Sequence, residues 1–171
     1  MNRSLKAVVA TLTVITLGVF LAPASSARPT WDRSPVHVTR QVTPIPKTVD
    51  LRVGQHPNYD RVVIDLRGPI PGYDVRYVKR LQYEGSGETV PLKGTRFIQI
   101  GVTTAVAHNG HGDSVYRGPE LEQYAMPALR GAAFTGDFEG TVSFGLALSR
   151  FKSFRVFELT GPNRLVIDLH H

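Results

Sequence analysis

The chain has 171 residues, no cysteine and a formal net charge of +6. Without cysteine there are no disulfides, no cysteine-ligated zinc and no lipid anchor on a cysteine at a cleavage point. Most of the excess charge lies near the N-terminus, since residues 48–171 hold 14 basic and 13 acidic side chains. This balance argues against nucleic acid, which needs a concentrated positive surface. The basic N-terminal part is suited only to weak, salt-dependent contact with an anionic surface.

The first 27 residues have the layout of a secretory signal peptide. Arg3 and Lys6 precede an uncharged apolar run at 7–21, and small residues lie before Arg28. Cleavage after Ala24 fits the small-residue rule as well. The run is shorter than the ~20 apolar residues that span a bilayer. We therefore expect a secreted or cell-envelope protein with no stable membrane insertion after cleavage.

Residues 28–47 are predicted to be a flexible, basic linker. Four prolines interrupt regular pairing, and the apolar residues are sparse and without period. Trp31 is the exception in this segment. It either packs back on the domain or contacts a partner, and the sequence does not separate these alternatives.

From residue 48 onward the pattern is that of an all-β domain. Apolar and polar residues alternate in short runs separated by Gly- and Pro-rich turns, and only 119–131 leaves room for a short helical turn. We predict a two-sheet antiparallel β-sandwich of about seven or eight strands over residues 48–171. The expected strands lie near 48–53, 61–67, 73–79, 97–106, 142–148, 154–159 and 165–169.

One hexapeptide occurs twice in this domain. Residues 61–66 read Arg-Val-Val-Ile-Asp-Leu, and residues 164–169 differ from them only by Leu165 in place of Val62. The two strands either pair side by side or occupy equivalent places in two sheets. Alternation puts Asp65 and Asp168 on the outward face, opposite the isoleucines, with Arg61 and Arg164 on the same side as the aspartates.

A family resemblance is carried by residues 51–54, 59–66, 72–78, 137–140, 154–156 and 162–169. On these residues the chain resembles the AMIN family, specifically the AMIN-like domains of secreted bacterial proteins, over residues 48–171. The resemblance implies a β-sandwich that serves as a localisation module in the cell envelope and associates with peptidoglycan. Amidase activity is not implied, because no zinc amidase domain accompanies the module. The segment at roughly 103–140 is longer than the compact family pattern needs.

No set of residues in the sequence makes a convincing catalytic or metal site. His108, His111 and Asp113 have the spacing of metal ligands, but the glycines around them indicate a solvated loop. Asp137 and Glu139 would share one face of an extended strand, although acid–base pairs usually face each other across a cleft. We therefore expect a non-enzymatic protein without metal or cofactor.

A binding surface is the better-supported expectation. Arginines grip carboxylates with two hydrogen bonds, and sugars stack on exposed aromatic rings. The alternative is that the arginines pair with Asp65, Asp74 and Asp168 across strands and the tyrosines belong to the core. The predicted partner is peptidoglycan or another wall glycan, and the alternative is an envelope protein bound by a scaffold module. The predicted ligand contacts are Arg61, Arg164, Arg76, Tyr73 and Tyr77.

Overall fold

The computed structural model describes residues 29–171, which form two packed antiparallel sheets without a helix. The expected signal peptide lies outside the described residues. The strands are β1 Val36–Val38, β2 Lys47–His56, β3 Tyr59–Arg67, β4 Gly72–Val78, β5 Arg96–Thr103, β6 Leu121–Gln123, β7 Leu129–Phe138, β8 Thr141–Leu148, β9 Phe154–Leu159 and β10 Arg164–His170.

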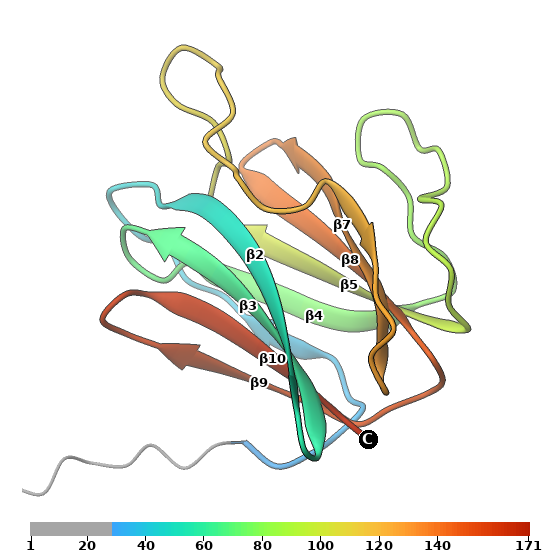
Figure 1. Cartoon of the computed structure of the whole chain (residues 1–171). Helices are drawn as coiled ribbons and strands as arrows, with labels where there is room; N and C mark the ends of the chain where they lie inside the picture. The colour runs from blue at the N-terminus through green and yellow to red at the C-terminus, as the bar shows by residue number, and fades with distance from the viewer. Residues whose placement is uncertain (1–28) are drawn as a thin grey trace, which may run out of the picture.

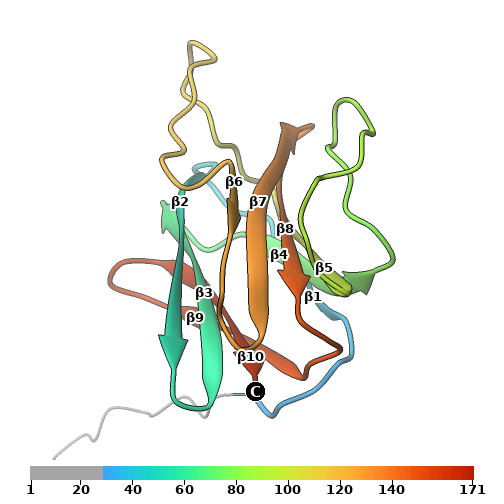
Figure 2. The ribbon, with the colours of Figure 1, turned by 45° about the vertical axis from the view of Figure 1, so that its right-hand side comes forward.

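The predicted β-sandwich is confirmed, with more strands than expected. One sheet has six strands in the order β1-β4-β5-β8-β7-β6, and the other has four in the order β2-β3-β10-β9 (Figure 1). Figure 2 shows the two sheets as separate layers, with the C-terminus at one end and the loop between β5 and β6 at the other. The additional strands come from two three-residue edges, β1 and β6, and from β7.

Strand alternation builds the core between the layers. The inward residues of β3, β5, β8 and β10 are apolar and almost wholly buried, and Phe144, Ile98, Ile64 and Ile167 are among them. A buried side chain of this size contributes about 1.5–3 kcal/mol relative to its exposed state. Both sheets and the whole core lie within residues 29–171, so a protein of residues 28–171 contains everything that the described fold needs.

The expectation of a flexible linker at 28–47 is wrong for most of that segment. Asp32 exchanges two backbone hydrogen bonds with Phe154, at 2.9 and 2.7 Å, and β1 then pairs with β4. Arg40 reaches the other sheet, with Nη2 3.0 Å from the Glu158 carboxylate. Pro35 directly precedes β1, and Pro44 and Pro46 lie between β1 and β2, so no proline of this segment interrupts a strand.

The segment expected at 103–140 as an extra insertion contains β6 and β7, and β7 is an inner strand of the six-stranded sheet. No helical turn occurs at 119–131 in the described chain. β7 is rich in Gly and Ala and carries bulges at Leu129/Gly131 and Phe134/Gly136, which disturb the alternation of its side chains. Its sequence therefore gave no clear strand period.

Candidate functional site

The two copies of the hexapeptide pair side by side as β3 and β10. Their register is centred on Val63 opposite Val166, so that Arg61 lies opposite Asp168 and Arg164 opposite Asp65. Of the two arrangements that the sequence allowed, the first is confirmed. The two arginines share the outer face of the four-stranded sheet, four residues apart along it, which is about 13 Å.

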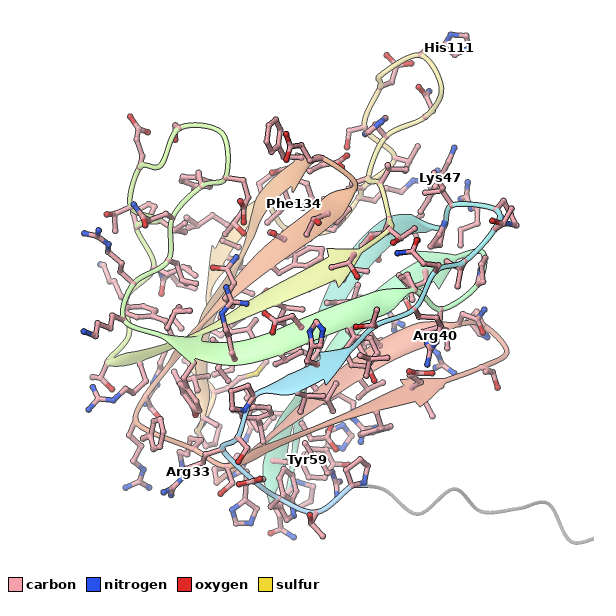
Figure 3. All side chains as sticks on the ribbon, turned by 180° about the vertical axis from the view of Figure 1, so that it is seen from behind. Arg33, Arg40, Lys47, Tyr59, His111 and Phe134 are labelled. Carbon is pink, nitrogen blue, oxygen red and sulfur yellow. The ribbon has the colours of Figure 1, made fainter. Side chains whose placement is uncertain are left out.

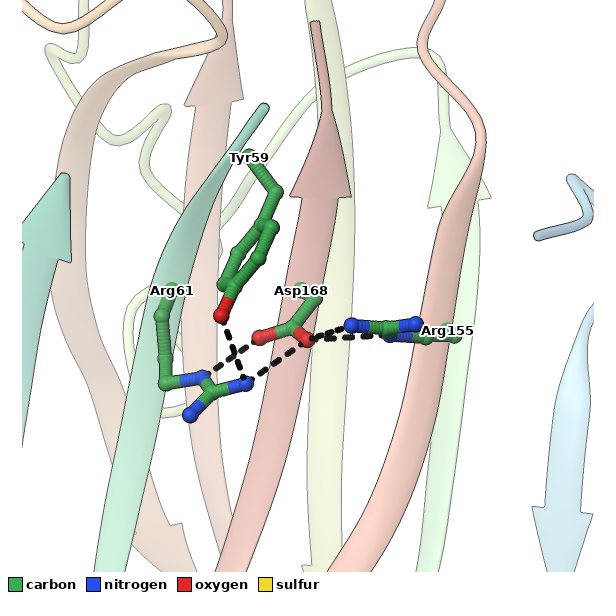
Figure 4. Close-up of polar contacts among 4 residues, drawn as sticks. All are labelled: Tyr59, Arg61, Arg155 and Asp168. Atoms are coloured by element: carbon green, nitrogen blue, oxygen red, sulfur yellow. Dashed lines mark hydrogen bonds and ion pairs between the residues drawn. The ribbon is translucent and has the colours of Figure 1, made fainter. Parts of the chain in front are cut away.

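An arginine–aspartate cluster occupies one end of this face (Figure 4). Arg61 donates from Nε and Nη2 to the two oxygens of Asp168, at 2.6 and 2.9 Å. Arg155, on β9, donates from Nε and Nη2 to Asp168 Oδ2 at 2.9 and 2.8 Å. The hydrogen bonds to Asp168 raise the pKa of Arg61 above its ordinary value.

Aromatic rings cover this cluster from the solvent side. Arg155 Cζ lies 4.2 Å from the ring centroid of Trp31, and Arg61 Cζ lies 5.1 Å from that of Tyr59. Trp31 also contacts His170, at 4.9 Å between ring centroids. The structure thus shows Trp31 packed back on the domain, which is one of the two alternatives that the sequence left open.

Asp168 is not exposed, although it points away from the core as alternation predicted. Its side chain is fully buried, and those of Arg61 and Arg155 are 17% and 13% exposed. The reason is that Arg155, from the neighbouring strand β9, binds Asp168, and Trp31, from far away in the sequence, lies over Arg155. The equivalent Asp65 pairs instead with Arg52, whose side chain is 55% exposed. The burial of the cluster, and the hydrogen bonds that Asp168 accepts from both arginines, therefore indicate a role in stabilising the fold.

The other predicted contacts do not gather at one place. Tyr73 faces the core, is 5% exposed and donates its hydroxyl hydrogen to Glu158, at 3.1 Å. Tyr77 lies at the end of β4 and hydrogen-bonds Lys152. Arg164 donates to the Pro162 carbonyl and forms no ion pair within residues 29–171. Arg76 lies on the opposite outer face of the sandwich.

Burial of the tyrosines predicts a loss of stability at high pH. Burial is the main reason that the pKa of Tyr73 rises to about 12. Because the folded-state pKa is raised, this contribution is complete below the unfolded value near 10 and is lost as pH rises through 12. We expect the unfolding midpoint in urea to fall between about pH 9 and about pH 11, and to fall less in Tyr73→Phe. An equal fall in both proteins would contradict this assignment.

A polar groove crosses the outer face of the six-stranded sheet, around Arg76. It consists of two adjoining hollows of about 350 and 360 Å³, which share Arg76, Glu84 and Gln99. We call this feature the sheet groove. The remaining lining residues are His37, Asp74, Val78, Arg80, Gln82, Tyr83, Gly87, Gly101, Thr103, Thr141 and Ser143.

Strand register explains why the sheet groove is hollow. Asp74, Gly101 and Ser143 are direct neighbours across β4, β5 and β8, so two of the three positions in this row carry small side chains. On one side a row of Thr103 and Thr141 stands next to them. Beyond the other side, residues 79–95 fold over the sheet, and Leu81 packs where Gly145 leaves room.

The chemistry of the sheet groove suits a neutral polar ligand. Arg76 pairs with Asp74 along β4, and both remain partly accessible, at 50% and 21% of the side chain. Gln99 offers an amide donor and acceptor between them and the groove floor. Cationic and anionic side chains line the groove together, so it favours hydroxyl and amide groups over a strongly charged ligand.

The loop that carries the candidate metal ligands is ordered by its own hydrogen bonds. Asn109 accepts from the backbone of His111 and Asp113, at 2.8 and 3.0 Å. His108 turns away from these residues to Asp137, with 2.6 Å between Nδ1 and Oδ2, and His111 lies at the loop tip (Figure 3). Within residues 29–171 no three His, Cys, Asp or Glu side chains gather as metal ligands.

The candidate carboxylate pair also separates. Asp137 Oδ2 accepts the backbone N–H of Ala107 at 2.8 Å as well as facing His108. Glu139 is in the turn after β7 with φ +46°, so it does not continue the strand face that Asp137 occupies. The pair does not have the arrangement of an acid and a base across a cleft.

Several structurally important side chains were not predicted from the sequence as parts of the fold's charge network or of a groove. Arg155 completes the arginine–aspartate cluster from β9, and its role depends on pairing with β10. Asp60 is fully buried and accepts the backbone N–H groups of Ala128 and Leu129. Gln99 and Ser143 form the sheet groove only through register with other strands. Alternation identified their faces, but not their neighbours.

The two sheets form a β-sandwich module with a polar groove on one outer face. A family model described as AMIN-like domain matches residues 46–171. The chain belongs to the AMIN-like domain family, which confirms the resemblance, and this family consists of modules associated with the cell wall and envelope. A comparison with curated proteins found no match. Among residues 29–171 there is no helix with the length and apolar character to cross a membrane.

Proposed function

We propose that this protein is an exported, non-enzymatic module that binds peptidoglycan or a related wall polymer along the sheet groove. The observation that carries the proposal is the groove itself, a polar channel with a floor of small residues at Gly101 and Ser143. Family membership supports an envelope location. Of the five contacts predicted from sequence, Arg76 is the one that lines this groove.

A glycan strand fits the chemistry of the groove. Its hydroxyl and N-acetyl groups are donors and acceptors for Gln99, Arg76 and His37, and Tyr83 provides a half-buried ring at one end. The two hollows follow one another across the sheet, as successive sugars of a linear polymer require. Arg61 and Tyr73 already have partners within the fold, so we do not include them in this contact surface.

The proposal predicts that filling the groove floor weakens binding without harming the fold. In Gly101→Val the added Cβ meets only Thr141 within 4 Å, at an ordinary contact distance of 3.6 Å, and valine favours strands. We expect residues 28–171 to pellet with purified sacculi at low and moderate salt. We expect the Gly101→Val variant to lose at least about tenfold in affinity, roughly the loss of one or two hydrogen bonds.

Gly54→Val is the matched control. Gly54 lies in β2 on the other sheet, and a Cβ there has no neighbour within 4 Å. This variant is expected to pellet like the unmodified protein, and thermal unfolding of both variants should remain cooperative. Failure of the unmodified domain to pellet, or equal binding by both variants, would refute the sheet groove as the site.

A scaffold module remains the second candidate, and the edge of β9 favours it. Along this edge, Asp32 hydrogen-bonds the backbone of Phe154 only. Because the backbone groups of a strand alternate in direction, the N–H and C=O groups of Val156 and Glu158 also face away from β10. No described residue hydrogen-bonds these groups, and such an edge accepts a partner's strand. Pelleting with crude envelopes but not with protein-free sacculi would identify this function instead.

A further inference from the structure

A basic pocket lies at one end of the sandwich, away from the sheet groove. Its volume is about 380 Å³, and its walls come from the end of β4, the start of β5 and the β8–β9 loop. Tyr77 and Phe151 form its apolar side, with ring centroids 4.3 Å apart. The lining residues are Tyr77, Val78, Lys79, Thr95, Arg96 and Phe151.

The charged residues that line this pocket are both positive. Lys79 and Arg96 line it, and Arg33 lies over Phe151, with Cζ 5.0 Å from the ring centroid. No carboxylate is among the lining residues, and these three cations form no ion pair within residues 29–171. The nearest acidic neighbour in sequence, Asp32, accepts the backbone N–H of Arg33.

Tyr77 holds the pocket wall in a fixed position. Its hydroxyl donates to the Lys152 carbonyl at 2.5 Å and accepts from the Lys152 backbone at 3.0 Å. Burial raises the pKa of Tyr77, while the charges of Arg33 and Arg96 oppose the rise. Both guanidinium groups therefore act on the same small volume that Tyr77 borders.

Phe151 extends this surface toward solvent. It is 44% exposed, and it lies in the loop between β8 and β9, beside Arg150. An exposed aromatic ring surrounded by unpaired Lys and Arg is the pattern of a contact with a membrane interface. The ring enters the boundary between headgroups and acyl chains, and the cations meet the lipid phosphates.

The place of Arg33 in the sequence also favours contact between the basic pocket and a membrane. Arg33 lies at the end of the sandwich opposite the His111 loop (Figure 3). The expected signal peptide, with its apolar run at 7–21, ends only a few residues before Arg33. During export this end of the domain is the one closest in the chain to the segment that enters the bilayer.

We propose that the basic pocket docks the domain peripherally on an anionic phospholipid surface. Phe151 inserts beside the headgroups, and Arg33, Lys79 and Arg96 contact their phosphates. This contact is separate from wall-polymer binding, because the sheet groove and the basic pocket share only Val78 in their linings. The domain is then able to hold a membrane surface and a wall polymer at the same time.

Vesicle flotation of residues 28–171 tests this proposal. We expect flotation with vesicles of phosphatidylcholine and phosphatidylglycerol at a ratio of about 3 to 1, and none with phosphatidylcholine alone. Each removed cation should lower the partition coefficient about fivefold at low salt. The double variant Lys79→Gln/Arg96→Gln and the single variant Phe151→Ser should therefore float poorly.

Matched variants at the opposite end of the sandwich serve as controls. Lys47 and Arg67 pair in register at the far end of β2 and β3, and Phe138 is 58% exposed at the end of β7. Lys47→Gln/Arg67→Gln and Phe138→Ser should float like the unmodified protein. Equal losses in the two sets would overturn the proposal, as would no flotation with the anionic vesicles.

The two binding proposals fail independently. Gly101→Val is expected to keep vesicle binding, and Phe151→Ser is expected to keep binding to sacculi, because their positions lie in different hollows. A Phe151→Ser variant that remains folded but loses both activities would refute the separate pocket.

Discussion

Replacing Asp168 with Asn is expected to lower the free energy of unfolding by about 3–5 kcal/mol, because it leaves largely buried guanidinium groups without their anion. Asp168 is fully buried and accepts two hydrogen bonds from Arg61 and two from Arg155. An asparagine keeps the size of the side chain but not its charge. Urea unfolding followed by the fluorescence of Trp31, which covers the cluster and is the single tryptophan of the chain, measures the change.

The hexapeptide repeat provides the control for this experiment. Asp65 occupies the equivalent position in β3, and its partner Arg52 is 55% exposed. Asp65→Asn is expected to change the free energy of unfolding by no more than about 1 kcal/mol, since an exposed ion pair contributes little. Equal effects of the two substitutions would show that burial does not distinguish the copies.

Replacing Asp60 with Ala is expected to cost about 2–6 kcal/mol, since two buried backbone N–H groups lose their acceptor. Asp60 Oδ2 lies 2.7 Å from the nitrogen of Ala128 and 2.8 Å from that of Leu129. His171 Nε2 lies 3.4 Å from the other carboxylate oxygen. Hydrogen exchange should accelerate at the amides of Ala128 and Leu129, where β7 begins.

Asp50→Ala is the comparison for Asp60. Asp50 lies half-buried in β2, and its side chain makes no hydrogen bond within the described part of the chain. We expect its replacement to change the free energy of unfolding by about 0.5 kcal/mol or less. An equally mild effect of Asp60→Ala, with unchanged exchange at Ala128 and Leu129, would contradict this role of Asp60.

These predictions separate the two outer faces of the sandwich by role. One end of the four-stranded sheet buries charges in the arginine–aspartate cluster, which fixes Trp31 and the N-terminal segment to the domain. The six-stranded sheet leaves its polar groups accessible in the sheet groove. The repeated hexapeptide thus belongs mainly to the stability of the fold, and the proposed ligand contact lies on the other layer.

Strand prediction succeeded where alternation was regular and failed where pairing alone made the strand. β2, β3, β8 and β10 alternate clearly and were all expected. β1 has three residues between prolines, and it is a strand because β4 presents an edge to it. β7 became recognisable only through its partner β8, since its two bulges break the local period.

The candidate site was harder to predict for the same physical reason. Arg76 was expected in a binding surface, and it lines the sheet groove. The neighbours that complete the groove, Gln99, Gly101 and Ser143, belong to other strands and carry no motif of their own. A hollow depends on which side chains stand next to each other across strands, and this register is not a property of any one segment.

The sequence by itself determined the all-β class, the family and the inward face of each regular strand, because side-chain alternation is a local property. Only the tertiary structure decided which outward charges are buried. Asp168 and Asp65 occupy equivalent positions in matching hexapeptides, yet one lies under Trp31 and Arg155 and the other near solvent. Burial depends on segments distant in sequence, so identical local patterns acquired different roles.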